Sequence, residues 1–362
     1  MGISTNSFAV SAKAADLRTE RNYWIYNKQW DLIFIILSAS LIALPLVLNL
    51  ILHNFVGISQ AAVRTVVALA VTVAVGGPHM YATFTRTAME KSFIKTHPKI
   101  MVGSLLIPVG VIWLGLSNFI ILLTVFFFWA SIHVLHQIVY LVECYNTKSP
   151  KTLSVKSRVI DYAVVLTSLY PLAFRRMVRG TFVIGSNKMP FPEVLRGDWF
   201  WMLFVLIFVV FLVLFTKKTV QEVKEGTVLW PKVLLIYVTA FSAFLIPTFH
   251  DLDVAFQGMN TWHSFQYLGL TWYINRLRSE RGEISSSFVK KISRKNNNGI
   301  AFYLTVVAVT VSTVAIIMFL QHVVGLSKDQ SYYITVLTFL LMHYLHDHVL
   351  FTDTDVLQVR TA

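Results

Sequence analysis

Long apolar blocks alternate with short polar connections along the whole chain. Ten such blocks can be counted, most of them near or above the roughly 18 residues that a membrane-spanning helix needs. They lie at residues 32–54, 60–83, 101–116, 118–143, 159–174, 199–216, 233–249, 254–275, 300–322 and 332–352. This pattern predicts an all-α, multi-pass membrane bundle of about ten helices, within a range of eight to ten.

Composition agrees with this interpretation. Of the 362 residues, 56% are hydrophobic and only 14% are charged, a balance that is unusual for a soluble protein. We therefore expect an interfacial or cytoplasmic segment at 1–31, one transmembrane domain at 32–352 and a cytoplasmic tail at 353–362. Residues 1–31 are polar, and the first apolar block starts too late and runs too long for a secretory signal.

The basic residues indicate an orientation. Lys and Arg gather in the N-terminal segment and in the connections after the second, fourth, sixth and eighth blocks, whereas most of the other connections are nearly free of them. The positive-inside rule then places both termini in the cytoplasm. We expect the membrane to be the cell's inner or plasma membrane. The connection at 175–198 carries five basic residues on the opposite side and does not fit this orientation.

The net charge of +13 and the single cysteine each exclude a class of function. Because the charge is spread over the connections, it indicates membrane topology and not a nucleic-acid partner. With Cys144 as the only cysteine, an intramolecular disulfide and a cysteine-based zinc site are both excluded.

The main chemical signal is a layer of histidines within the predicted spans. Seven of the eleven histidines fall between the midplane and the cytoplasmic side of four blocks. They are His79, His133, His136, His263, His343, His346 and His348. A buried polar group without a partner is costly in lipid, so histidines at one common depth predict a shared site.

Helical spacing selects the residues that face this site. Positions three and four apart share a helix face. We therefore predict metal ligands at His79, His133, His136, His263, His343, His346 and Asp347, with Gln137, Tyr140, Gln266 and Tyr267 as the partners that orient them. His348 points elsewhere, and the Gly-Gly-Pro before His79 predicts a bend in that helix.

The donor types narrow the choice of metal. Several neutral imidazoles with one carboxylate suit iron, zinc, copper or manganese, while calcium and magnesium prefer oxygen ligands. The absence of further cysteines disfavours an iron–sulfur cluster. We expect iron, with one or two ions, and leave zinc, copper and haem open.

Two motifs carry a resemblance to known families. The segment GGPHMYAT at the end of an early span resembles the GxPH segment of Brp/Blh-type β-carotene oxygenases, which are polytopic membrane enzymes. HVLH and HYLHDH are similar to the histidine boxes of membrane desaturases and hydroxylases. This resemblance implies a non-haem iron held by histidines from several helices.

Together these observations predict an integral-membrane, iron-dependent oxidoreductase. It would use dioxygen on a lipophilic substrate that enters from the bilayer, with an electron donor as a further partner. Two alternatives stay open: a haem-binding electron-transfer protein, and a metal or proton transporter. The small number of intramembrane carboxylates, namely Glu143, Asp161 and Asp347, and the lack of a convincing internal repeat make transport the weaker alternative.

Overall fold

The computed structural model of the protein describes residues 23–149, 151–180, 183–184, 187–249, 252–294 and 299–357. Within these ranges nearly all regular structure is helical, and the strands are a two-residue hairpin of β1 (Val183–Ile184) and β2 (Asn187–Lys188). The predicted all-α class is confirmed. Residues 1–22 and 358–362, which include most of the predicted N-terminal segment and half of the tail, lie outside the described residues.

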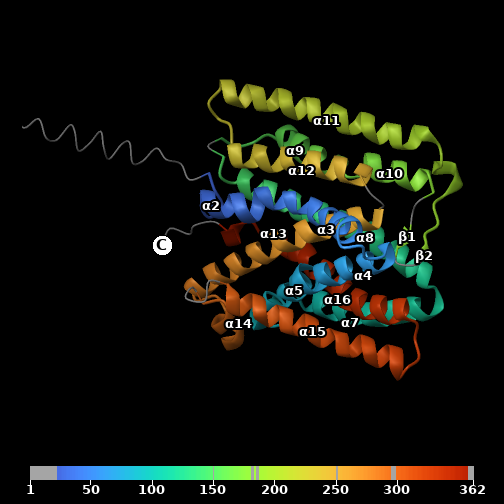
Figure 1. Ribbon diagram of the computed structural model, residues 1–362. Coiled ribbons are helices and arrows are strands. Elements are labelled where there is room, and N and C mark those ends of the chain that lie inside the picture. Colours follow the sequence, from blue (N-terminus) through green and yellow to red (C-terminus); the bar gives the residue numbers. More distant parts are fainter. Residues whose placement is uncertain are drawn as a thin grey trace, which may run out of the picture.

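The helices follow one another with short connections (Figure 1). The first half of the chain contains α2 (Lys28–Trp30), η1 (Asp31–Ile36), η2 (Leu37–Ala43), α3 (Leu44–Asn54), α4 (Gln60–Val71), η3 (Thr72–Gly76), α5 (Gly77–Ala82), η4 (Thr83–Thr85), α6 (Lys91–Thr96), α7 (Pro98–Ser117), α8 (Phe119–Asn146), α9 (Val155–Ser168) and α10 (Tyr170–Val178). The second half contains η5 (Glu193–Leu195), α11 (Asp198–Lys224), α12 (Trp230–Phe249), α13 (Leu252–Glu280), α14 (Ser287–Ile292), α15 (Ile300–His322), α16 (Lys328–Leu350) and η7 (Asp355–Leu357).

Seven helical stretches of the described chain are long and apolar enough to cross a membrane. They are Lys28–Asn54, Gln60–Thr85, Pro98–Ser117, Phe119–Asn146, Asp198–Lys224, Trp230–Thr248 and Ile300–His322. Each contains or largely overlaps one of the ten predicted blocks. Seven such helices suggest a membrane protein.

The three remaining blocks are not among these seven stretches, for physical reasons. Block 159–174 falls on two shorter helices, α9 and α10, because the helix is interrupted at Leu169 and α10 begins at Tyr170 with Pro171 in its first turn. Block 254–275 lies within α13, and block 332–352 falls on α16 except for its last two residues. Both helices are long enough for a span, but their polar side chains keep their hydropathy below that of the seven stretches. These two polar helices supply half of the histidine cluster described below.

Helix α13 lies at the centre of the bundle. It packs against segments from every third of the chain, including η1 and η2, α5, α8, α12 and η7. Polar and aromatic side chains along its length are fully buried, for example Trp262, Ser264 and Tyr267. The polar residues that make α13 a poor membrane span are therefore covered by other helices and not by lipid.

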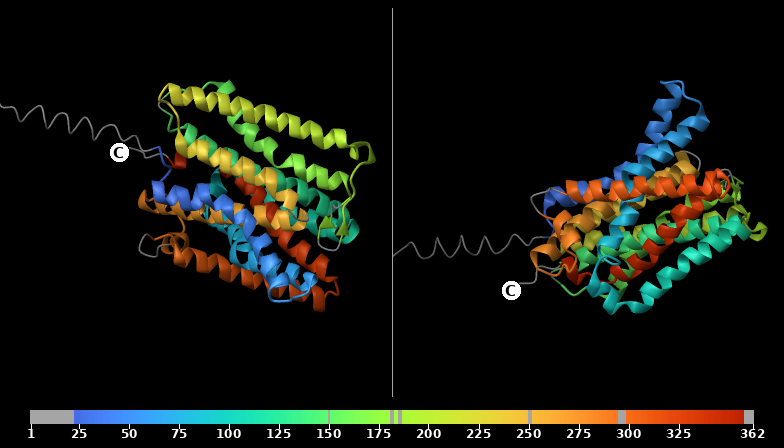
Figure 2. Two further views of the ribbon diagram at one scale, coloured as in Figure 1. Left: turned by 45° about the horizontal axis from the view of Figure 1, so that its top comes forward. Right: turned by 90° about the horizontal axis from the view of Figure 1, so that it is seen from below.

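The first two spans bend away from the bundle. Figure 2 shows α3 and α4 as a hairpin that projects from the other helices. The chain leaves the bundle through the π-helical η1 and the 3₁₀-helical η2, and it returns through the π-helical η3. Such wide and tight turns redirect a helix and are frequent near functional sites. The last of them, η3, ends directly before α5, which carries His79.

A network of buried charges ties α9, α11 and α12 together. Asp161 is fully buried and accepts hydrogen bonds from the ammonium groups of Lys218, at 2.5 Å, and Lys232, at 3.0 Å. Lys232 also donates to the side chain of Asn146 on α8. Because every charge in this group has a partner, we assign the network to structure and not to transport.

Candidate metal centre

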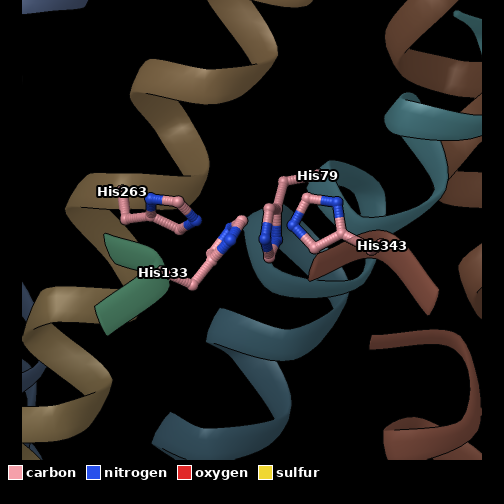
Figure 3. A group of neighbouring side chains, drawn as sticks. All are labelled: His79, His133, His263 and His343. Carbon is pink, nitrogen blue, oxygen red and sulfur yellow. The ribbon is translucent and has the colours of Figure 1, made fainter. Parts of the chain in front are cut away.

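Four histidines from four helices meet inside the bundle. His79 comes from α5, His133 from α8, His263 from α13 and His343 from α16, and all four side chains are buried. One ring nitrogen from each lies within 4.8 Å of the corresponding nitrogens of the others. Figure 3 shows the four imidazoles turned toward one another. The predicted convergence of histidines at one depth therefore produces a four-histidine group.

The rings are arranged as a closed cycle. His79 lies 5.0 Å from His263 and 4.7 Å from His343, measured between ring centroids. His133 lies 5.0 Å from His263 and 4.8 Å from His343. In every pair the ring planes are steeply inclined, at 68° to 89°. Each ring therefore meets the edges of two neighbours, which lets the nitrogens converge on a common point without stacking.

Several ring nitrogens of these four histidines have no hydrogen-bond partner within the described chain. The Nε2 atoms of His79, His133 and His343 and both ring nitrogens of His263 are buried, and no hydrogen bond to them is found within the described chain. Leaving buried polar atoms unpaired costs free energy, so such atoms need an explanation. A cation coordinated by the imidazoles would supply it, and the residues present fit a metal ion.

The opposite nitrogens of two rings are held by hydrogen bonds. His79 Nδ1 donates to the carbonyl of Gly76 at 2.5 Å and lies 2.9 Å from the hydroxyl of Ser264. His343 Nδ1 lies 2.5 Å from Oγ1 of Thr83, whose hydroxyl donates to Asp347. A proton on Nδ1 leaves the lone pair on Nε2, which is the tautomer that a metal ligand requires.

The Gly-Gly-Pro segment explains how His79 reaches the group. A bend was predicted here, and the structure has the π-helical segment η3, which is followed by α5 at Gly77. A Cβ atom at Gly77 would lie 2.2 Å from the side-chain methyl of Thr310 on α15, so only glycine allows the two helices to approach this closely. The backbone around Gly77 thus fixes the position of His79.

Asp347 borders the four-histidine group. Its Oδ1 atom accepts hydrogen bonds from the hydroxyls of Tyr267, at 2.7 Å, and Thr83, at 3.0 Å. Its Oδ2 atom is unpaired and lies 3.5 Å from His343 Nδ1 and 3.8 Å from His133 Nε2. Tyr267, which was predicted to orient the ligands, thus contacts the carboxylate of Asp347.

Two predicted ligands are not brought to the group. Both ring nitrogens of His346 are already engaged, Nδ1 with Thr87 at 2.8 Å and Nε2 with Ser104 at 2.6 Å. His136 is half-buried, and its ring lies 5.6 Å from that of His348, which is exposed. These residues occupy neighbouring faces of their helices, so sharing a turn with a ligand does not carry them into the centre.

Three of the predicted orienting residues form hydrogen bonds that connect helices, and none of these bonds is to a histidine ring nitrogen. Gln137 donates to the backbone carbonyl of His263 and to the side chain of Gln266, and Gln266 donates to the carbonyl of Ile35 in η1. Tyr140 donates to the carbonyl of Asp353. The hydroxyl groups that contact ring nitrogens of the four histidines belong to Thr83 and Ser264, which were not predicted as orienting residues. Thr83 lies one helical turn after His79, and Ser264 directly follows His263.

A pocket leads from the outside of the bundle to the histidines. It encloses an empty volume of about 780 Å³, part of which is open to the surroundings. Its walls come from α8, α10, α12 and α13, and most of its lining is aliphatic or aromatic. His79 and His263 are among the lining residues. An apolar compound in this pocket would therefore reach two of the four histidines.

Comparison with protein-family models, curated proteins and solved structures gives no match for this chain. Its function must therefore be argued from the site. Four convergent imidazoles with a neighbouring carboxylate can bind a transition-metal ion, and the adjoining pocket can hold an apolar molecule beside it.

Proposed function

We propose that the four-histidine group binds one iron ion and that the protein oxidises a lipophilic substrate with dioxygen. One observation carries the proposal: the apolar pocket includes His79 and His263 in its lining, so a substrate and the metal would share one space. Metal-assisted oxidation needs this arrangement, whereas a structural metal site needs no access for a substrate.

The donor set supports iron. Neutral imidazoles and one adjacent carboxylate match the ligands of non-haem iron, and zinc or copper would accept the same donors. When bound, iron would supply the one-electron and dioxygen chemistry that side chains lack. The electrons that such a reaction requires would come from the substrate or from a separate donor.

The chain's own residues would hold and orient the reactants. Hydrogen bonds from Nδ1 of His79 and His343 to Gly76 and Thr83 would fix both imidazoles in the ligand tautomer. The aliphatic and aromatic walls of the pocket would exclude water and place carbon–hydrogen or alkene groups next to the centre. The substrate would arrive from the bilayer, because the helices around the pocket carry exposed apolar side chains such as Phe128 and Leu245.

The geometry favours a bare ion over haem. A haem with two axial histidines needs the plane between them free for its macrocycle, but here two further imidazoles fill the space around any opposed pair. The pocket also speaks against ion transport, since none of its described lining residues is an acid, a lysine or an arginine. We further propose that the protein crosses an inner or plasma membrane several times, with both termini and the connections rich in lysine and arginine in the cytoplasm.

Metal analysis tests the proposal. The protein is purified in detergent, its metals are quantified by mass spectrometry, and its visible spectrum is recorded together with that of His263→Ala. We expect about one iron per chain without a haem spectrum, loss of the iron in the variant, and oxygen consumption when lipophilic alkenes are supplied. Absence of a stoichiometric metal from correctly folded protein would overturn the assignment.

A further inference from the structure

Asn260 lies where the pocket meets the histidine group. It lines the pocket together with His79 and His263, and it sits on α13 one turn before Ser264. Its side chain is partly buried. The proposed reaction gives Asn260 no role so far, although an amide in an apolar pocket beside a metal centre requires an explanation.

A chain of hydrogen bonds fixes which way the amide points. A carbonyl can only accept, so the 2.5 Å contact with Gly76 shows that His79 Nδ1 carries the proton. The hydroxyl of Ser264, 2.9 Å from this nitrogen, is then directed to Oδ1 of Asn260 at 3.1 Å. Since Oδ1 of Asn260 faces Ser264, its Nδ2 group is the end of the side chain that is left for another partner.

The amide N–H groups of Asn260 lack an acceptor. The only hydrogen bond of this side chain within the described chain is the one that Oδ1 accepts from Ser264. Gly76 leaves the space that Nδ2 occupies, because a Cβ atom at position 76 would lie 3.0 Å from it. The backbone thus accommodates the donor end of Asn260 without pairing it.

A second donor is weakly held in the same pocket. The hydroxyl of Tyr170 on α10 lies 3.4 Å from Oγ of Ser131, longer than a normal hydrogen bond between hydroxyls. The hydroxyl of Ser131 itself donates to the carbonyl of Phe128 at 2.8 Å. Tyr170 therefore keeps a hydroxyl proton available for a ligand that brings a better acceptor.

We infer that the substrate is an uncharged lipophile with an acceptor oxygen, a carbonyl, hydroxyl or ether group, and that Asn260 Nδ2 binds this oxygen beside the histidine group. That the bound molecule is a substrate rests on the proposed function, whereas its binding to Asn260 does not. The N–H groups of Asn260 and the hydroxyl proton of Tyr170 are the donors that remain available, so the pocket favours a ligand with an acceptor atom. A carboxylate or phosphate is disfavoured because the described lining offers no lysine or arginine.

The substitution Asn260→Leu, with Met259→Leu as the matched control in the pocket lining, tests the inference. Dissociation constants are measured for dibutyl ketone and for its parent alkane, nonane, using metal-free protein in detergent. We expect Asn260→Leu to weaken ketone binding about tenfold and to leave nonane binding unchanged, because one neutral hydrogen bond is lost. Met259→Leu should leave the ratio of the ketone and nonane dissociation constants unchanged.

A spectroscopic readout separates a direct bond from a change in packing. The ketone is labelled with ¹³C at its carbonyl, and its infrared stretch is recorded when bound. The native protein should shift this band to lower frequency, Asn260→Leu should abolish the shift, and Ser264→Ala should reduce it by releasing the amide. The inference would be overturned if the ratio of the ketone and nonane dissociation constants were the same in the native protein and in Asn260→Leu, and if the carbonyl band of the ketone were unshifted in the native protein. Metal content decides the proposed function separately, since binding is measured without metal.

Discussion

His133 and His136 lie on successive turns of α8, but only the ring of His133 joins the four-histidine group. The ring of His133 is 4.8 Å from that of His343, whereas His136 is half-buried and its ring faces His348 at 5.6 Å. A spacing of three residues leaves two side chains about 60° apart on a helix, which is enough to separate a ligand from a bystander.

The pair therefore offers a matched test of the metal site. We expect His133→Ala to lose the metal and His136→Ala to retain it at the native stoichiometry. Both variants remove the same side chain from the same helix, so a general effect on folding would appear in both. Metal analysis after size-exclusion chromatography measures the difference. Equal loss in the two variants would contradict the site described here.

Tyr267 should act through Asp347. Its hydroxyl holds Oδ1 of the carboxylate and leaves Oδ2 facing the histidines. We expect Tyr267→Phe to weaken metal affinity by about 10- to 100-fold, as for other residues that orient a ligand. Tyr140→Phe is the control, because that hydroxyl binds the carbonyl of Asp353 instead. Competition with a chromogenic chelator gives both affinities, and an unchanged affinity in Tyr267→Phe would remove Asp347 from the site.

Gly77 should tolerate no side chain while Thr310 is present. Overpacking of this contact is expected to destabilise Gly77→Ala by about 1–3 kcal/mol and to displace His79. The double variant Gly77→Ala with Thr310→Ala removes the methyl and hydroxyl that a new Cβ would meet, so part of the stability should return. Thermal unfolding in detergent and metal content report the two effects. Failure of the second substitution to rescue would place the strain elsewhere.

The buried pair Asp161 and Lys232 should be far more sensitive to single than to double substitution. Lys232→Met leaves Asp161 with one remaining ammonium partner, Lys218, and Asp161→Leu leaves Lys232 with only Asn146. Each single change is expected to cost about 3–5 kcal/mol, and the double variant less than the sum. A double-mutant cycle on unfolding midpoints measures the coupling, and strict additivity would show that the pair does not interact.

Much of the site could be predicted from helical depth. Placing His79, His133, His263 and His343 at one level of four helices needed only the order of apolar and polar blocks. Which histidines on a helix turn inward could not be predicted, because His136 and His346 satisfy the same spacing rule. Their separation depends on how far each helix is rotated in the bundle, and packing sets that rotation.

The hydroxyl partners and the exact number of spans were less accessible from the sequence. Thr83 lies four residues after His79 and Ser264 directly follows His263, but serine and threonine often bond to their own helix backbone, so their positions alone are ambiguous. The count of ten blocks overlooked the break before Pro171. It also treated α13 and α16 as ordinary spans, although their polar residues are buried against protein.

The polarity of α13 and α16 has a consequence for how the protein is made. In a membrane-inserted chain, neither helix has the hydropathy to leave the insertion machinery for lipid unaided, so each needs apolar neighbours that are already in place. Helix α13 follows α12, and α16 follows α15, each after a short connection. The last member of the four-histidine group, His343, arrives with α16. Under the proposed function, metal uptake should therefore be delayed until that helix has docked, and a ribosome-bound chain ending before it should not retain the ion.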